Sequence, residues 1–138
     1  MYANAIIYIQ KRARKYLEKF LELSAIDEHI KKQCIRIFLN IANNMPDSFE
    51  LIEKAAISYA RDSESSPFQP LIQAFGYNDQ VMVITLLKFI NQMIFNADDE
   101  ENKQGKFIAK LETLGIYDLL QKWGQSDNED IIGQITAF

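Results

Sequence analysis

Three consecutive segments decide the fold of this chain: PFQPLIQAF (67–75), VMVITLLKFINQMIFNADDEENKQGKF (81–107) and LETLGIYDLLQKWGQSDNEDIIGQITAF (111–138). Apolar residues recur in them at steps of three and four, which is the period of an amphipathic helix. Asn78 or Asp79 can cap a long helix, acidic residues at Asp98 and Asp99 suit the start of the next, and Gly115 stops it. The segments therefore predict consecutive helices and no strand.

The same period extends through the N-terminal half of the chain. Pro46, Asp47 and Glu50 have the order of a capped helix start. The expected helices cover residues 3–23, 26–44, 46–62, 79–96, 98–114, 116–123 and 127–137, and a further short helix begins within 67–75 and is ended by Gly76. Because 138 residues fit one domain, we predict a single all-α domain over 1–138.

A weak internal repeat indicates how these helices are arranged. Phe38-Leu39-Asn40 and Phe89-Ile90-Asn91 lie 51 positions apart, each late in an apolar helix, and an Asp follows each Asn after seven residues. Repeats of about forty residues, with two or three helices each, form armadillo- or HEAT-like stacks. We therefore expect an armadillo/HEAT-like helical repeat stack, a short α-solenoid, with a closed helical bundle as the alternative.

Charge and cysteine content narrow the class of partner. The net charge is −4, but residues 1–36 carry eight Lys/Arg against four Asp/Glu, whereas residues 37–138 carry seven against fifteen. The acidic part of the chain, residues 37–138, argues against nucleic acid and favours a basic or mixed protein segment as the partner.

A single Cys allows no internal disulfide, and no apolar run is long enough to span a membrane. These features indicate a cytoplasmic protein.

Two polar stripes are candidates for a partner-binding groove. The helix 79–96 is expected to bury Leu86, Leu87, Ile90, Met93 and Ile94, and its other stripe contains Val81, Ile84, Lys88, Asn91 and Phe95. The earlier helix is expected to bury Ile30, Cys34, Ile37, Phe38 and Ile41, and its matching stripe contains Lys32 or Gln33, Arg36, Asn40 and Asn43. Such mixed stripes suit the apolar face of a partner helix.

Each stripe also has a simpler interpretation. The residues can be ordinary solvated helix positions. The amides of Asn40 and Asn91, late in their helices, can bond the backbone of a neighbouring loop and so join successive repeats, and they can do this while still facing the groove.

The sequence has no pattern of catalytic or metal-binding residues. His29 and Cys34 have no third ligand at metal-site spacing, and Cys34 is expected to be a buried small apolar residue. The acidic run 98–101 lacks the alternation and central Gly of a calcium loop. No known nucleophile, phosphate or dinucleotide motif occurs. We therefore expect no enzymatic activity, no metal and no cofactor.

Five segments, in this order and at this spacing, carry a resemblance to a known family: FQPLIQAF (68–75), LLKFIN (86–91), the Asp-Asp-Glu helix start (98–100), LETLGIYDLLQ (111–121) and NEDIIGQITAF (128–138). They resemble the armadillo-like FH3, or diaphanous inhibitory, region of diaphanous-related formins, specifically its C-terminal part. The resemblance is formin-like over 46–138 and thins over 1–45 to a helical pattern.

The resemblance implies a regulatory binding module. In that family the concave groove binds the formin's own C-terminal tail as an amphipathic helix, and a Rho-type GTPase relieves this contact and frees the actin-assembling half. By resemblance, Lys88 and Asn91 line the groove, as do Arg36, Asn40 and Asn43 on the earlier helix. The implied protein is cytoplasmic and cytoskeleton-associated, and it meets actin only indirectly.

The chain also departs from the family's pattern. The family has four or more repeats after a GTPase-binding element, whereas few residues precede the matched part here, so we expect a fragment or a shortened relative. Lys103 and Lys106 stand where the family has an Arg. A shortened stack would expose an apolar face at its start, which predicts either homodimerisation or a poorly ordered first helix.

Two alternative functions stay open. The armadillo region of engulfment-and-motility proteins shares the helix pattern, and it would fail to bind a basic tail peptide. A helical self-assembly domain would use the apolar face of residues 3–23, and changing Ile6 and Ile9 to Asp would then yield a monomer.

Overall fold

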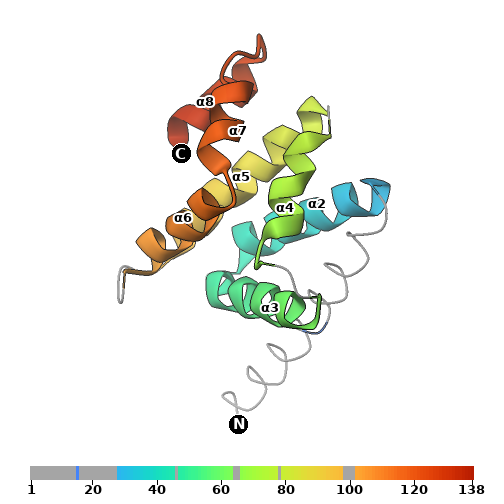
Figure 1. Cartoon of the computed structure of the whole chain (residues 1–138), viewed down its shortest axis with the longest axis vertical. Coiled ribbons are helices and arrows are strands. Elements are labelled where there is room, and N and C mark those ends of the chain that lie inside the picture. Colours follow the sequence, from blue (N-terminus) through green and yellow to red (C-terminus); the bar gives the residue numbers. More distant parts are fainter. Residues whose placement is uncertain (1–14, 16–27, 46, 64–65, 78, 98–101) are drawn as a thin grey trace.

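The computed structural model describes residues 15, 28–45, 47–63, 66–77, 79–97 and 102–138. The regular elements within these residues are all helical (Figure 1), which confirms the predicted all-α fold class. They are α2 (Glu28–Asn44), α3 (Ser48–Ser63), α4 (Gln69–Gln73), the 3-10 turn η1 (Ala74–Gly76), α5 (Gln80–Asn96), α6 (Lys103–Thr113), α7 (Ile116–Trp123) and α8 (Glu129–Ala137). The helix expected over 3–23 lies outside the described residues, apart from Lys15.

Side-chain caps and one glycine determine several helix boundaries. Asp79 caps α5, where its Oδ1 accepts a hydrogen bond from the Met82 N–H at 3.1 Å, as the sequence predicted. Asn128 caps α8 in the same way. Gly115, with φ of 92°, takes the left-handed conformation that turns the chain between α6 and α7.

Helix α6 begins at Lys103, directly after Asn102, which has a left-handed φ of 56°. The predicted helix start at Asp98 and Asp99 lies outside the described residues.

The helices repeat in a fixed order. Helix α5 runs through the middle of the molecule, with α2 packed along one flank and α8 along the other (Figure 1). Helices α3 and α6 form a second pair, joined by an edge-to-face contact between Phe49 and Phe107 with ring centroids 5.6 Å apart. Helices α4 and α7 line a common depression. The units α3–α4–α5 and α6–α7–α8 therefore follow one another as successive layers of a helical repeat stack.

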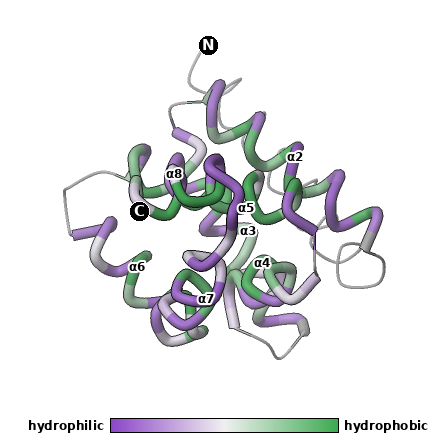
Figure 2. Tube along the Cα trace, turned by 90° about the horizontal axis from the view of Figure 1, so that it is seen from above, coloured by the Kyte–Doolittle hydropathy of each residue, from purple (hydrophilic) through white to green (hydrophobic). Residues whose placement is uncertain are grey.

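The repeat seen in the sequence corresponds to a contact in the core. The rings of Phe38 on α2 and Phe89 on α5 lie 5.9 Å apart, and both side chains are fully buried. Equivalent residues of neighbouring helices thus pack against each other, which is how a stack buries a continuous core. Hydrophobic and hydrophilic residues alternate along the helices (Figure 2), as expected when each helix buries one side.

The buried face of α2 differs from the prediction. Cys34 and Phe38 are buried as expected, but Ile30, Ile37 and Ile41 are only partly buried. The residues buried in their place are Lys31, Ile35 and Ala42. The buried arc is turned by roughly one residue position around the helix, because α2 packs mainly along α5.

Lys31 explains part of this difference. Its side chain is only 4% exposed, its Nζ donates to the Tyr77 hydroxyl at 3.5 Å, and it lies 5.1 Å from the centre of the Tyr77 ring. A lysine on the buried side of a helix is rare, so the hydrophobic pattern pointed to the neighbouring arc.

None of the helices in the described ranges is both long and apolar enough to cross a membrane.

Candidate partner groove

A pocket of about 200 Å³ lies between α2 and the start of α5. We use the name α2–α5 groove for this pocket together with the exposed side chains of the two helices beyond it, Arg36, Asn40 and Asn43 on α2 and Val81, Lys88 and Phe95 on α5. The lining residues of the pocket are Lys32, Ile35, Arg36, Asp79, Val81, Met82 and Thr85. The pocket therefore has an apolar floor with charged groups at its rim.

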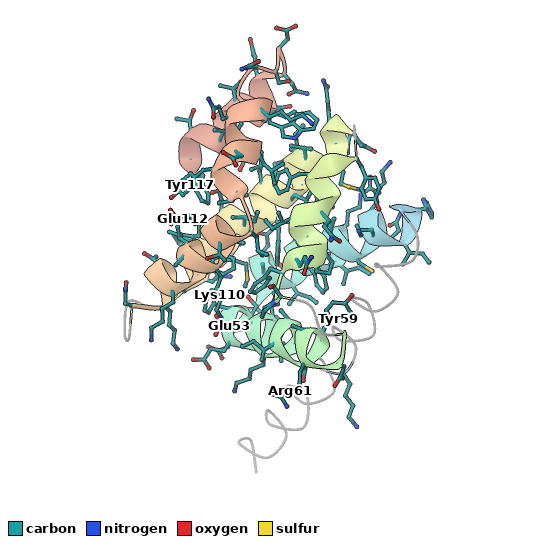
Figure 3. All side chains as sticks on the ribbon, in the orientation of Figure 1. Glu53, Tyr59, Arg61, Lys110, Glu112 and Tyr117 are labelled. Carbon is teal, nitrogen blue, oxygen red and sulfur yellow. The ribbon has the colours of Figure 1, made fainter. Side chains whose placement is uncertain are left out.

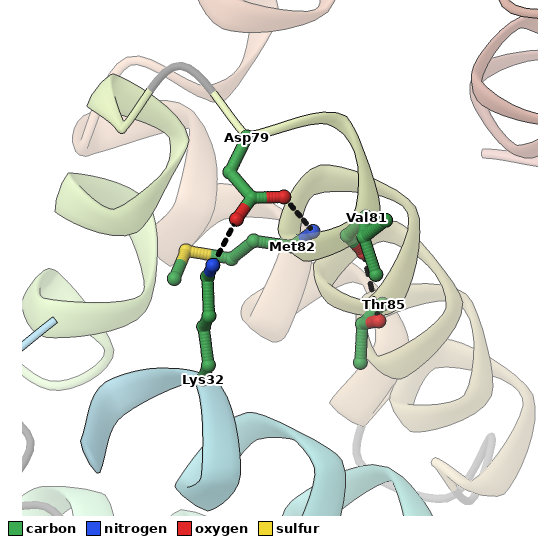
Figure 4. A network of polar contacts seen from close by, with 5 residues as sticks. All are labelled: Lys32, Asp79, Val81, Met82 and Thr85. Carbon is green, nitrogen blue, oxygen red and sulfur yellow. Dashed lines mark hydrogen bonds and ion pairs between the residues drawn. The ribbon is translucent and has the colours of Figure 1, made fainter. Parts of the chain in front are cut away.

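An ion pair crosses the groove at the pocket. The Lys32 ammonium on α2 contacts the Asp79 carboxylate, whose other oxygen caps α5 (Figure 4). The hydrogen bond from Lys32, followed by that from the Met82 N–H, holds the pKa of Asp79 below its usual range. Asp79 thus stays ionised and ties α2 to the N-terminus of α5. The sequence predicted only the capping role, since Lys32 is 47 positions away.

The candidate stripe on α5 divides into two groups. Val81 and Phe95 are exposed to 58% and 79%, and Lys88 between them is also exposed. Ile84 and Asn91 are partly buried instead. The open face of α5 thus consists of Val81, Lys88 and Phe95.

Asn91 joins α5 to α8. Its Nδ2 donates to the backbone oxygen of Gln134 at 2.9 Å and to the side-chain Oε1 of the same residue at 3.1 Å. This is the repeat-joining interpretation of the sequence, with a helix carbonyl in place of a loop carbonyl. Asn96 does the same toward α2, donating to the Ala42 carbonyl at 2.8 Å and to the Ser48 hydroxyl at 3.2 Å.

The α2 wall of the groove is polar. Arg36, Asn40 and Asn43 are all exposed. Asn40 accepts two hydrogen bonds from Asn44 Nδ2, at its carbonyl oxygen and at its Oδ1, so it bonds within its own helix and does not join repeats. Of the predicted residues, Arg36 and Val81 line the pocket, Asn40, Asn43, Lys88 and Phe95 are exposed, and Ile84 and Asn91 are partly buried in the stack.

Sequence reasoning missed the polar contacts between helices α3 and α6, which belong to successive layers of the stack. Between α6 and α3, Lys103 pairs with Glu50. The Lys110 ammonium lies 3.6 Å from the Glu53 carboxylate (Figure 3). These pairs are partly exposed, so each contributes about 1 kcal/mol or less to stability. Their partners lie more than fifty positions apart, a separation at which no local pattern signals a contact.

The described residues offer little for catalysis or metal binding. No group of three or more His, Cys, Asp or Glu side chains in these ranges could hold a metal ion. Cys34 is buried, as predicted, and burial raises the pKa of its thiol, which makes it a poor nucleophile. What the arrangement provides is a surface for contact.

The fold and the open groove together define an all-α helical-repeat domain. The chain matches the family model of the FHOD1/3 FH3 domain over residues 11–119, which is most of its length. The chain therefore belongs to the FHOD1/3 FH3 domain family, whose members are regulatory domains of formins, and the resemblance identified in the sequence is confirmed. No match was found among curated proteins.

Proposed function

We propose that this domain captures an amphipathic helix in the α2–α5 groove, and that the helix is the autoregulatory C-terminal tail of the same formin-like protein. The observation that carries this proposal is the pairing of unmatched charge with exposed apolar surface. Arg36 and Lys88 have no ion-pair partner among the described residues, and Val81 and Phe95 are the exposed large apolar side chains of α5.

The energetics of this surface favour a partner. A phenylalanine that is four-fifths exposed leaves apolar area in water, and covering it contributes about 1.5–3 kcal/mol. A groove between two helices suits an amphipathic helix, whose apolar stripe covers such residues while its flanks meet the polar walls.

Membership of the FH3 family supports the regulatory part of the proposal. The captured tail would hold the protein inactive, and a Rho-type GTPase would release it and allow actin assembly. Such a protein acts in the cytoplasm at the cytoskeleton. The domain itself would bind without catalysing a reaction and would need no cofactor.

Titration with a fluorescent peptide that spans the C-terminal tail of the full-length protein tests this proposal. We expect saturable binding by the wild-type domain, weakened by Lys88→Glu and by Arg36→Glu. Lys54→Glu is the matched control, because Lys54 is exposed on α3 outside the groove. Asn91→Asp is unsuitable as a groove variant, because Asn91 bonds α8.

Two results would refute the proposal. One is no binding by a folded wild-type domain, which would favour the engulfment-and-motility or self-assembly alternatives. The other is binding that all three charge reversals reduce equally, which would mean non-specific attraction to the whole surface.

A further inference from the structure

The exposed face of α5 has a regular spacing. Val81, Lys88 and Phe95 follow one another at intervals of seven residues. Seven residues are close to two helical turns, and the drift is only about 20° per interval, so the three side chains form one nearly straight line. The line is about 21 Å long at 1.5 Å per residue. Along it the surface is apolar, then cationic, then apolar.

The polar groups beside this line already have partners. The Thr85 hydroxyl donates to the Val81 carbonyl at 2.9 Å, and Gln92 Nε2 donates to Asn96 Oδ1 at 2.9 Å. The pocket's carboxylate, Asp79, is held by Lys32 and by the Met82 N–H. Among the described residues, the positive charges that remain unmatched beside this line are those of Lys88, at its middle, and of Arg36, which lines the pocket at the Val81 end. This local charge is opposite in sign to the net charge of the chain.

The direction of a bound helix follows from where the apolar residues are. Among the described residues the exposed large apolar side chains are Val81, Phe95 and Tyr117, and Tyr117 lies on α7. The exposed residues of α2 and α8 are polar or small. A helix that crosses from α2 to α8 would therefore cover at most one of the two apolar residues. A helix that lies along α5 covers both.

We infer that the occupant of the α2–α5 groove lies lengthwise along α5 and presents a contact stripe that is apolar, acidic and apolar at seven-residue intervals. This inference rests on the proposed function and specifies its partner. The partner helix needs about 15 residues, or four turns, to reach from Val81 to Phe95. Its central carboxylate meets Lys88, so a tail that is basic overall must still be acidic at this point of its stripe.

Two synthetic helical peptides provide the test. The heptad peptide has Leu, Glu and Leu at successive seven-residue intervals on an otherwise neutral helix, and the lysine peptide has Lys in place of that Glu. Binding of each to the 138-residue chain is measured by fluorescence anisotropy. We expect the heptad peptide to bind the wild type more tightly than the lysine peptide does, and Lys88→Glu to reverse this order, each by roughly three- to tenfold.

The apolar ends are tested separately. Phe95→Ser and Val81→Ser should each weaken binding of the heptad peptide, and the loss of affinity with Phe95→Ser should be about tenfold or more. Both side chains are exposed, so neither change should disturb folding. Tyr117→Ser is the matched control, an exposed aromatic residue on another helix, and it should leave binding unchanged.

Several outcomes would overturn the inference. They are no binding of the heptad peptide, equal binding of the two peptides, or insensitivity to Phe95→Ser. Concentration-dependent dimerisation that Phe95→Ser abolishes would also overturn it, because a second copy of the chain would then cover the line. If Lys88→Glu and Arg36→Glu abolish binding of the natural tail peptide but Phe95→Ser does not, the proposed function stands and the lengthwise arrangement fails.

Discussion

Asn91 gives the sharpest test of how this structure assigns roles, because its sequence position also fits a groove residue. Asn91→Asp replaces the Nδ2 donor with a carboxylate oxygen that faces two acceptors, the backbone oxygen and the Oε1 of Gln134. The lost hydrogen bonds and the new repulsion should together cost about 1–3 kcal/mol. Since Gln134 lies on α8, the damage should be concentrated where α8 packs on α5.

Urea unfolding and hydrogen exchange measure the two parts of this prediction. For a domain of this size the loss corresponds to a fall in melting temperature of roughly 3–10 °C. Amides of α8 should exchange faster than those of α2. Asn40→Asp is the matched control, because Asn40 is the repeat-equivalent residue, is exposed, and accepts its hydrogen bonds. It should change stability by less than about 0.5 kcal/mol.

The reasoning fails if Asn91→Asp is as stable as the wild type, if its α8 amides exchange as slowly as those of the wild type, and if it nevertheless no longer binds the tail peptide. In that case Asn91 faces the partner, as its place in the sequence stripe first indicated, and the contact with Gln134 contributes nothing.

Three further predictions concern stability. Asp79→Asn keeps a good N-cap but loses the ion pair with Lys32, so urea unfolding near neutral pH should show a loss below about 1 kcal/mol. Because the folded-state pKa of Asp79 is lowered, its contribution is present above the unfolded value near 4 and lost as pH falls through the folded value, so the variant should lose less stability on acidification. In thermal melts, Gly115→Ala should lower stability by about 1–2 kcal/mol, because Gly115 has a φ of 92°. Gly133→Ala should instead raise stability by about 0.5–1 kcal/mol, because Gly133 lies at an exposed helix position with open space around it. Phe89→Ala should cost about 3–5 kcal/mol in urea unfolding, because the side chain is fully buried against Phe38.

Each of these predictions has a result that contradicts it. Parallel acid profiles for Asp79→Asn and the wild type would mean that the carboxylate is not stabilised in the folded state. Equal effects of alanine at the two glycines would contradict the left-handed turn at Gly115. A loss below about 1 kcal/mol for Phe89→Ala would mean that α2 and α5 do not share one core.

The helices of this protein were largely predictable, because their signals are local. Apolar residues at steps of three and four, the cap at Asp79 and the stop at Gly115 act within a few residues, and the observed α5, α7 and α8 follow them closely. The helix start expected at Asp98 and Asp99 lies outside the described residues, and the left-handed conformation of Asn102 is a feature that composition does not reveal.

The candidate site was predictable only in part. Lys88, Phe95 and Arg36 are exposed, as the stripes indicated, but Ile84 and Asn91 are partly buried although they share the same helical spacing. Helical spacing defines an arc of side chains. It does not show where a neighbouring helix cuts into that arc.

The sequence by itself determined most of the helices in the described residues, the all-α class and the FH3 family, since all three depend on residue order and short-range periodicity. Only the tertiary structure decided which side of α2 is buried, that Asn91 bonds Gln134, and that Lys32 pairs with Asp79. These contacts join residues more than forty positions apart. They depend on the rotation of each packed helix, and a turn of one residue position moves a side chain by about 100°, from the core to the groove.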